Sequence, residues 1–347
     1  MLFHLGALWR LNEAGYLPKL DRVSSVSGGS MAAAFLAKHW HRLKLDTAEV
    51  SPHFREAVVE PTRRLAGRTV DVPTIAIGIL RPGPVGNQAA RTLQRHAFDK
   101  TMLQDLPDRP RFIFNATNLQ SAVLWRFSKP YMRDYRVGEV QSPHVSLATA
   151  VAASAAFPPF LSPVQLELEE RDYTPGSGTD LQRPPFSTRP ALTDGGIYDN
   201  LGLETAWKRY QTILISDGGG RIGGKADVKR DWPRHAHRVL NVIDSQVRAL
   251  RKRQAIDGFR AGRRDGTYWG IRTNIADYGI PDTLPCPFEQ TQILAGVATR
   301  LKKLDPATQE RLINWGFAVC DAALRAHVDN TLPPAETFPY PSRGVRE

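Results

Sequence analysis

The stretch that most constrains the fold is RVSSVSGGSMAAAFLA, residues 22–37. A short β-rich run, residues 22–25, enters Ser-Gly-Gly-Ser, and an alanine-rich helix follows at once. A strand that turns sharply into a helix is typical of layered α/β domains with a largely parallel sheet. Such a turn exposes the serine at its tip, which makes Ser27 a candidate nucleophile.

Segments on either side predict the same fold class. Residues 2–14 repeat apolar side chains three or four apart and stop at Gly15, which predicts a helix. Residues 111–127 are typical of two strands joined by a polar turn, and residues 212–219 of a strand that ends in an acid and glycines. Residues 172–190 are rich in Pro, Gly, Ser and Thr, which predicts a long exposed loop, either a lid or a surface insertion.

After residue 220 the sequence becomes basic, with a helical pattern. We expect one domain over residues 1–220, a basic helical region over 221–330 and a Pro-rich tail over 331–347. Within the helical region, Asp305-Pro306 supplies an N-cap and a first-turn proline for an amphipathic helix that runs to about His327. The sequence thus predicts an α/β domain with a helical C-terminal extension.

The charge of the chain limits its partners. Its 347 residues include 46 Lys and Arg against 35 Asp and Glu, a net charge of +11, which favours anionic partners. A basic run lies around Arg248–Arg264. It has three interpretations: a solvated helix face, a patch for an anionic membrane surface, or a patch for nucleic acid. No helix-turn-helix, zinc finger or RNA-binding signature accompanies it, so nucleic acid is the least favoured.

Nothing in the sequence predicts secretion or a membrane span. Residues 142–166 lie in the longest stretch without Asp, Glu, Lys or Arg, but four prolines exclude one continuous helix. The opening residues have no basic n-region and no cleavage site. Cys286 and Cys320 are too few for a disulfide framework or a zinc site. We expect a cytoplasmic protein, peripheral at the membrane at most, with no metal or nucleotide cofactor.

The turn around Ser27 meets the requirements of a nucleophile elbow. Small residues stand two positions before and after the serine, at Ser25 and Gly29, and Gly29 allows the helix to approach the strand closely. Gly28 contributes an N–H, and the helix points its positive end at Ser27, which stabilises developing negative charge. The alternative is a turn that binds phosphate without catalysis.

A serine hydroxyl needs a base, and LTDGGIYDNLG, residues 192–202, offers Asp194. A carboxylate at a strand end can reach an elbow on a neighbouring strand. A plain Asp-Gly-Gly turn is the alternative for this motif. A Ser-Asp-His triad is a further alternative, because His235 and His237 follow Asp194 in the chain.

Three motifs in this order resemble the patatin-like phospholipase family. They are Ser-x-Ser-Gly-Gly-Ser before an alanine-rich helix, AVAASAAFPP at residues 150–159, and TDGGIYDN at residues 193–200. The resemblance runs from about Met1 to Gly220. It implies a three-layer fold with a central, mostly parallel sheet flanked by helices, and hydrolysis of phospholipid or other lipid esters through an acyl-enzyme. It makes Ser27 the nucleophile and Asp194 its base, without a cofactor.

The resemblance also implies two features around this dyad. Residues 157–160, Phe-Pro-Pro-Phe, would pack near the site and line the acyl pocket. Family members carry Gly-Gly-Gly-x-Arg after their first strand, where backbone N–H groups form the oxyanion hole. Met1 stands about where that loop should end, so we expect the strand and the loop to be missing upstream of Met1. Two functions stay open: a serine acyl-ester hydrolase, and a catalytically impaired lipid- or phosphate-binding relative that retains the elbow.

Overall fold

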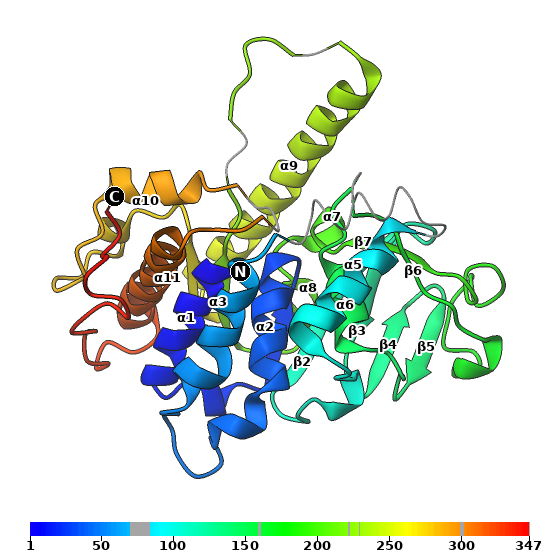
Figure 1. The fold of residues 1–347 in the computed structure, drawn as a ribbon, viewed down its shortest axis with the longest axis horizontal. Coiled ribbons are helices and arrows are strands. Elements are labelled where there is room, and N and C mark those ends of the chain that lie inside the picture. The colour runs from blue at the N-terminus through cyan, green and yellow to red at the C-terminus, as the bar shows by residue number, and fades with distance from the viewer. Residues whose placement is uncertain (70–83, 159–160, 221–222, 229, 299–301, 347) are drawn as a thin grey trace.

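The computed structural model describes residues 1–69, 84–158, 161–220, 223–228, 230–298 and 302–346 (Figure 1). A seven-stranded sheet and a separate two-stranded sheet lie among helices. The larger sheet consists of β1 (Arg22–Ser25), β2 (Arg111–Asn118), β3 (Val123–Phe127), β4 (Tyr131–Asp134), β5 (Gly138–Gln141), β6 (Val164–Gln165) and β7 (Ala191–Asp194). The smaller sheet pairs β8 (Thr212–Asp217) with β9 (Asp265–Gly270).

The helices confirm the two that the sequence marked most clearly, α1 and α11. The α-helices of the described residues are α1 (Leu2–Glu13), α2 (Gly28–Lys38), α3 (Glu60–Ala66), α5 (Val85–Leu93), α6 (Leu147–Ser154), α7 (Gly196–Asp199), α8 (Glu204–Trp207), α9 (Trp232–Arg260), α10 (Phe288–Ala295) and α11 (Pro306–His327). As predicted, the Asp305 side chain caps α11 by accepting a hydrogen bond from the Thr308 N–H. Within the described part of the chain, no helix combines the length and the apolar character that crossing a bilayer requires.

The prediction of a central, mostly parallel sheet is wrong. In the larger sheet, ordered β5-β4-β3-β2-β7-β6 with β1 on β2, only β1 and β2 pair in parallel among the described strands. The connections explain this result. Residues 119–122, 128–130 and 135–137 link consecutive strands from β2 to β5, and a parallel crossover needs a dozen or more residues. The hairpin expected over residues 111–127 is confirmed.

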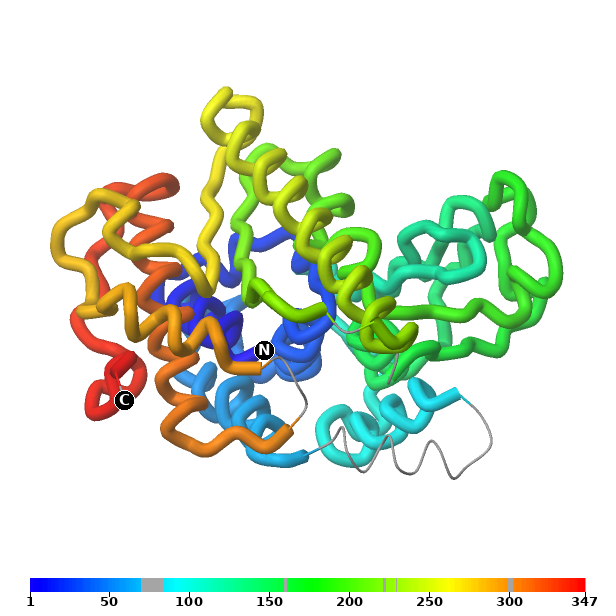
Figure 2. The backbone as a smooth tube through the Cα atoms, turned by 90° about the horizontal axis from the view of Figure 1, so that it is seen from above, coloured from blue at the N-terminus to red at the C-terminus, as the bar shows by residue number. Residues whose placement is uncertain are grey.

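The C-terminal helix packs directly on the N-terminal one. A Cβ on Gly6 of α1 would lie 1.9 Å from the carbonyl oxygen of Ile313, and a Cβ on Gly316 of α11 would lie 1.9 Å from that of Phe3. Glycine at both positions lets the two backbones touch. Residues on both sides of the boundary proposed at residue 220 therefore share one core with α2 and β2. Viewed from above, α9 lies between this helical side and the β2–β5 hairpins (Figure 2).

Candidate active site

The site forms where two strands meet on one edge of β2. β3 occupies one edge of β2, so β1 and β7 share the other edge. β1 runs parallel to β2 and ends opposite Phe114, whereas β7 runs antiparallel and ends opposite Ala116. Their carboxyl ends therefore face each other across Asn115. This arrangement brings Ser27, two residues after β1, and Asp194, the last residue of β7, to one place.

Ser27 has the backbone geometry of a residue at the tip of a sharp turn. Its φ of 53° and ψ of −124° are unusual for a residue other than glycine, and such conformations cost about 1–3 kcal/mol. α2 begins at the next residue, and the first amides of a helix have no acceptor within that helix, which leaves the Gly28 N–H without an acceptor in α2. The Gly29 N–H donates to the Val26 carbonyl at 2.9 Å.

The end of α6 ties the serine turn to the aspartate turn. The carbonyl oxygen of Ser154 accepts hydrogen bonds from the Ser27 N–H at 3.1 Å and from the Gly195 N–H at 3.2 Å. The Ser154 hydroxyl accepts from the same Ser27 N–H at 3.1 Å and lies 2.8 Å from the Ser30 hydroxyl. Ser154 is fully buried. Sequence analysis missed this role, although Ser154 is the single polar residue in AVAASAAFPP.

We expect Ser154→Ala to lower kcat about tenfold with little change in KM, because a buried hydroxyl that orients the Ser27 backbone is lost while the carbonyl contacts remain. Ester hydrolysis and thermal unfolding would be measured in parallel. Ser142→Ala is the matched control, since Ser142 also has a positive φ, 45°, but is exposed. An unchanged kcat together with a lower melting temperature would reduce Ser154 to a purely structural role.

Asp194 is a buried carboxylate with one free oxygen. Its Oδ1 accepts the Gly196 N–H at 2.7 Å, whereas its Oδ2 has no hydrogen-bond partner in the described structure. Burial raises the pKa of Asp194 to about 7, against the lowering effects of the Gly196 N–H and the Ser27 hydroxyl, and the nearby Asp244 raises it further. Ser27 is thus close enough to lower this pKa, but it does not pair with Oδ2 in normal hydrogen-bond geometry.

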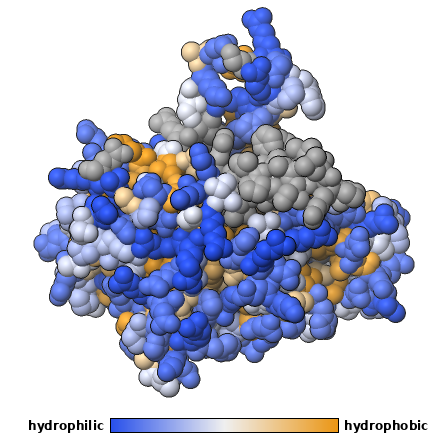
Figure 3. All heavy atoms as spheres, in the orientation of Figure 1, coloured by the Kyte–Doolittle hydropathy of each residue, from blue (hydrophilic) through white to orange (hydrophobic). Residues whose placement is uncertain are grey.

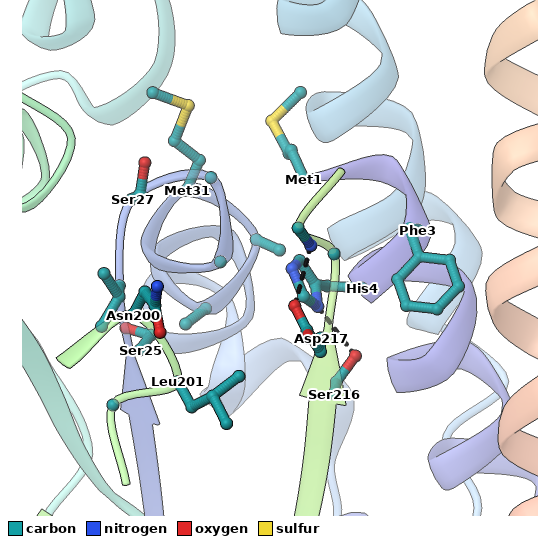
Figure 4. A pocket seen from close by; sticks show the side chains of 18 of the residues that line it. Met1, Phe3, His4, Ser25, Ser27, Met31, Asn200, Leu201, Ser216 and Asp217 are labelled. Carbon is teal, nitrogen blue, oxygen red and sulfur yellow. Dashed lines mark hydrogen bonds between the residues drawn. The ribbon is translucent and has the colours of Figure 1, made fainter. Parts of the chain in front are cut away.

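A cavity of about 1590 Å³ holds both side chains. Residues of β1 and β8 line it, and Figure 4 shows Met31 and Leu201 among the other side chains that line it. Of the residues expected at the acyl pocket, Phe157 and Pro158 line the cavity, while residues 159–160 lie outside the described part of the chain. Among the described residues, none from 172–190 lines it.

Among the described residues, no hydrogen bond joins a histidine to Ser27 or Asp194. His4 of α1, which sequence analysis did not single out, lies across the cavity, where its Nδ1 is 2.8 Å from the Ser216 hydroxyl (Figure 4). Burial, with a smaller effect of the adjacent amino terminus, lowers the pKa of His4 to about 3. His235 and His237 are exposed on α9, and only His237 of these two lines the cavity.

The second half of the TDGGIYDN motif anchors α9. The Asn200 side chain donates to the backbone oxygen of Asp244 at 3.0 Å and to its carboxylate at 3.3 Å. Asp199 lies 3.6 Å from Arg251, and Asp244 pairs with Arg248 at 2.9 Å. Part of the basic run is therefore engaged inside the molecule, a consequence of tertiary contacts that the sequence did not reveal.

Comparison with known proteins identifies the family to which this chain belongs. A search of curated proteins found no match. The family model described as patatin-like phospholipase matches residues 1–207, which is more than half of the chain. The matched residues include the serine turn, the end of α6 and the aspartate turn. The expected resemblance is thereby confirmed, and the chain belongs to the patatin-like phospholipase family, whose members are hydrolases of lipid ester bonds.

Proposed function

We propose that this protein is a serine acyl-ester hydrolase of the phospholipase A or lipid acyl hydrolase type, with Ser27 as nucleophile and Asp194 as base. One observation carries the proposal: β1 and β7 end face to face on one edge of β2. A serine at positive φ and a buried carboxylate with a free oxygen thereby share one cavity. This pairing of nucleophile and base is what acyl transfer to a serine requires.

In the first step, ionised Asp194 takes the proton of the Ser27 hydroxyl as its Oγ attacks the ester carbonyl carbon. A pKa of about 7 suits a general base that works near neutral pH. Negative charge develops on the carbonyl oxygen, where the Gly28 N–H and the positive end of α2 stabilise it. The Gly29 N–H is bonded to the Val26 carbonyl and is therefore not available to this oxygen. Gly29 supports the elbow only by allowing the helix to approach the strand closely.

Collapse of the tetrahedral intermediate completes acylation. Protonated Asp194 returns its proton to the leaving alcohol oxygen, the ester C–O bond breaks, and the acyl group stays on Ser27. Asp194 then takes a proton from water as the water oxygen attacks the acyl carbon. The bond between that carbon and Ser27 Oγ breaks, Asp194 gives the proton to Oγ, and the carboxylic acid leaves. The apolar cavity residues Met31, Phe157 and Leu161 are suited to hold the acyl chain.

A fluorophosphonate probe tests the nucleophile directly. We expect the probe to label the protein, Ser27→Ala to abolish labelling, and the exposed serine variant Ser142→Ala to keep it. A His235→Asn, His237→Asn double variant should also keep it, because no histidine takes part in a Ser-Asp dyad. Labelling lost in that folded double variant would favour a triad. A folded wild-type protein without labelling would contradict the hydrolase and favour a lipid- or phosphate-binding relative.

A further inference from the structure

α9 carries exposed apolar side chains along one side, from its first residue to Leu250. We call this set the apolar stripe of α9: Trp232, Val239, Val242, Ile243 and Leu250. Trp232 is 82% exposed and Leu250 is 58% exposed. At 3.6 residues per turn, these positions gather on one face of the helix. Exposed apolar side chains aligned on one helix face are typical of an interaction site.

The other side of the same helix belongs to the active-site cavity. His237, Asn241 and Asp244 line that cavity together with Ser27. Figure 1 shows the N-terminal half of α9 projecting beyond the body of the molecule, and the side chains of the stripe are exposed. Whatever binds the stripe therefore lies one helix away from the reacting serine.

Charge identifies the kind of partner. Residues 231–264 contain nine Lys and Arg against three Asp. Two of the three acids are paired, Asp231 with Arg234 and Asp244 with Arg248. A second copy of this helix would bring like charges together, whereas an anionic surface complements them. Exposed Arg253 continues the line of the stripe beyond Leu250, toward the C-terminus of α9.

A second apolar group lies on the same side of the molecule. Figure 3 shows a largely hydrophilic face on which apolar residues gather over α10. Phe288 and Ile293 of this helix are 46% and 50% exposed. Figure 1 places α10 at the upper end of the body, the end from which α9 projects. Exposed apolar side chains thus occur on both helices.

We propose that this face docks on a bilayer that contains anionic phospholipid. The apolar stripe of α9 enters the boundary between headgroups and acyl chains, and the flanking arginines contact headgroups. This assignment moves membrane contact away from Arg248, Arg251 and Arg264, which bond within the protein. The docking itself does not depend on the proposed function. Its consequence, that Ser27 acts on esters at the membrane surface, rests on that function.

Sedimentation with vesicles tests the docking face in a Ser27→Ala background, so that binding is measured without catalysis. The vesicles contain equal parts of phosphatidylcholine and phosphatidylglycerol, with pure phosphatidylcholine for comparison. We expect binding to the mixed vesicles to be the stronger and to fall at least about tenfold when Trp232, Val239, Ile243 and Leu250 are all changed to Ser. Val50→Ser, Leu119→Ser is the control, because both residues are exposed elsewhere.

Trp232 gives a second readout of insertion. Brominated lipid should quench part of the tryptophan fluorescence, and Trp232→Phe should remove that part. Undiminished vesicle binding by the folded stripe variant would overturn the proposal, as would equal binding to neutral vesicles. A dimer that the stripe variant converts to monomer, with vesicle binding unchanged, would assign the face to a second copy. Failure of the dyad would appear in probe labelling and would leave vesicle binding as it is.

Discussion

Asp194→Asn is expected to lower kcat by about four orders of magnitude while making the protein more stable above pH 7. An amide cannot accept the proton that the Ser27 hydroxyl must lose, so the base is removed with little change of shape. The hydrogen bond from the Gly196 N–H to Oδ1 persists, because the amide oxygen accepts it equally. The effects on activity and on stability therefore have opposite signs.

The stability effect follows from the raised pKa. Asp194 titrates near 7 in the folded protein and near 3.8 when unfolded. Below the unfolded pKa both states are protonated, and no penalty exists. Between these values the unfolded chain ionises first, so stability falls as pH rises, until the folded group also ionises above 7. Three pKa units correspond to about 4 kcal/mol, which is the upper limit of what the neutral amide recovers at high pH.

Urea unfolding of Asp194→Asn and the natural sequence at about pH 2.8 and about pH 8, each roughly one unit outside the titration, would measure this difference. We expect a clear gain in the free energy of unfolding at the higher pH and a small one at the lower. Asp46→Asn, at an exposed position, should change neither stability nor kcat. A loss of stability at the higher pH would show that the carboxylate is favourably solvated or paired in the fold.

Gly195→Ala is expected to lower kcat about a hundredfold. A Cβ at this position would lie 2.3 Å from the backbone oxygen of Asn115. This oxygen belongs to β2, which holds β1 and β7 in register, so it cannot move aside as a flexible side chain would. The aspartate turn must shift instead, which takes Asp194 away from Ser27.

Gly223→Ala is the matched control, because no atom lies within 4 Å of the position of its Cβ. Initial rates on a soluble ester and probe labelling would be compared for both variants. Labelling should fall with kcat in Gly195→Ala, since both need an activated Ser27. Near-normal kcat in a folded Gly195→Ala protein would mean that the position of the aspartate turn does not limit the reaction.

Local features were predictable because neighbouring residues encode them. The apolar repeat before Gly15 predicted α1, and the Asp305-Pro306 cap predicted the start of α11. The small residues around Ser27 predicted a sharp turn into a helix, and the structure has one. Strand direction was mispredicted, although the short links after β2, β3 and β4 already favoured hairpins.

The sequence by itself determined the family, the sharp turn at Ser27 and the choice of Asp194 as its candidate partner. Only the tertiary structure decided that β1 and β7 share one edge of β2, that Ser154 joins their turns, and that burial raises the pKa of Asp194. It also decided which arginines pair internally and which side of α9 is exposed. Turns and caps depend on a few adjacent residues, whereas strand pairing, burial and ion pairs depend on groups far apart in the chain.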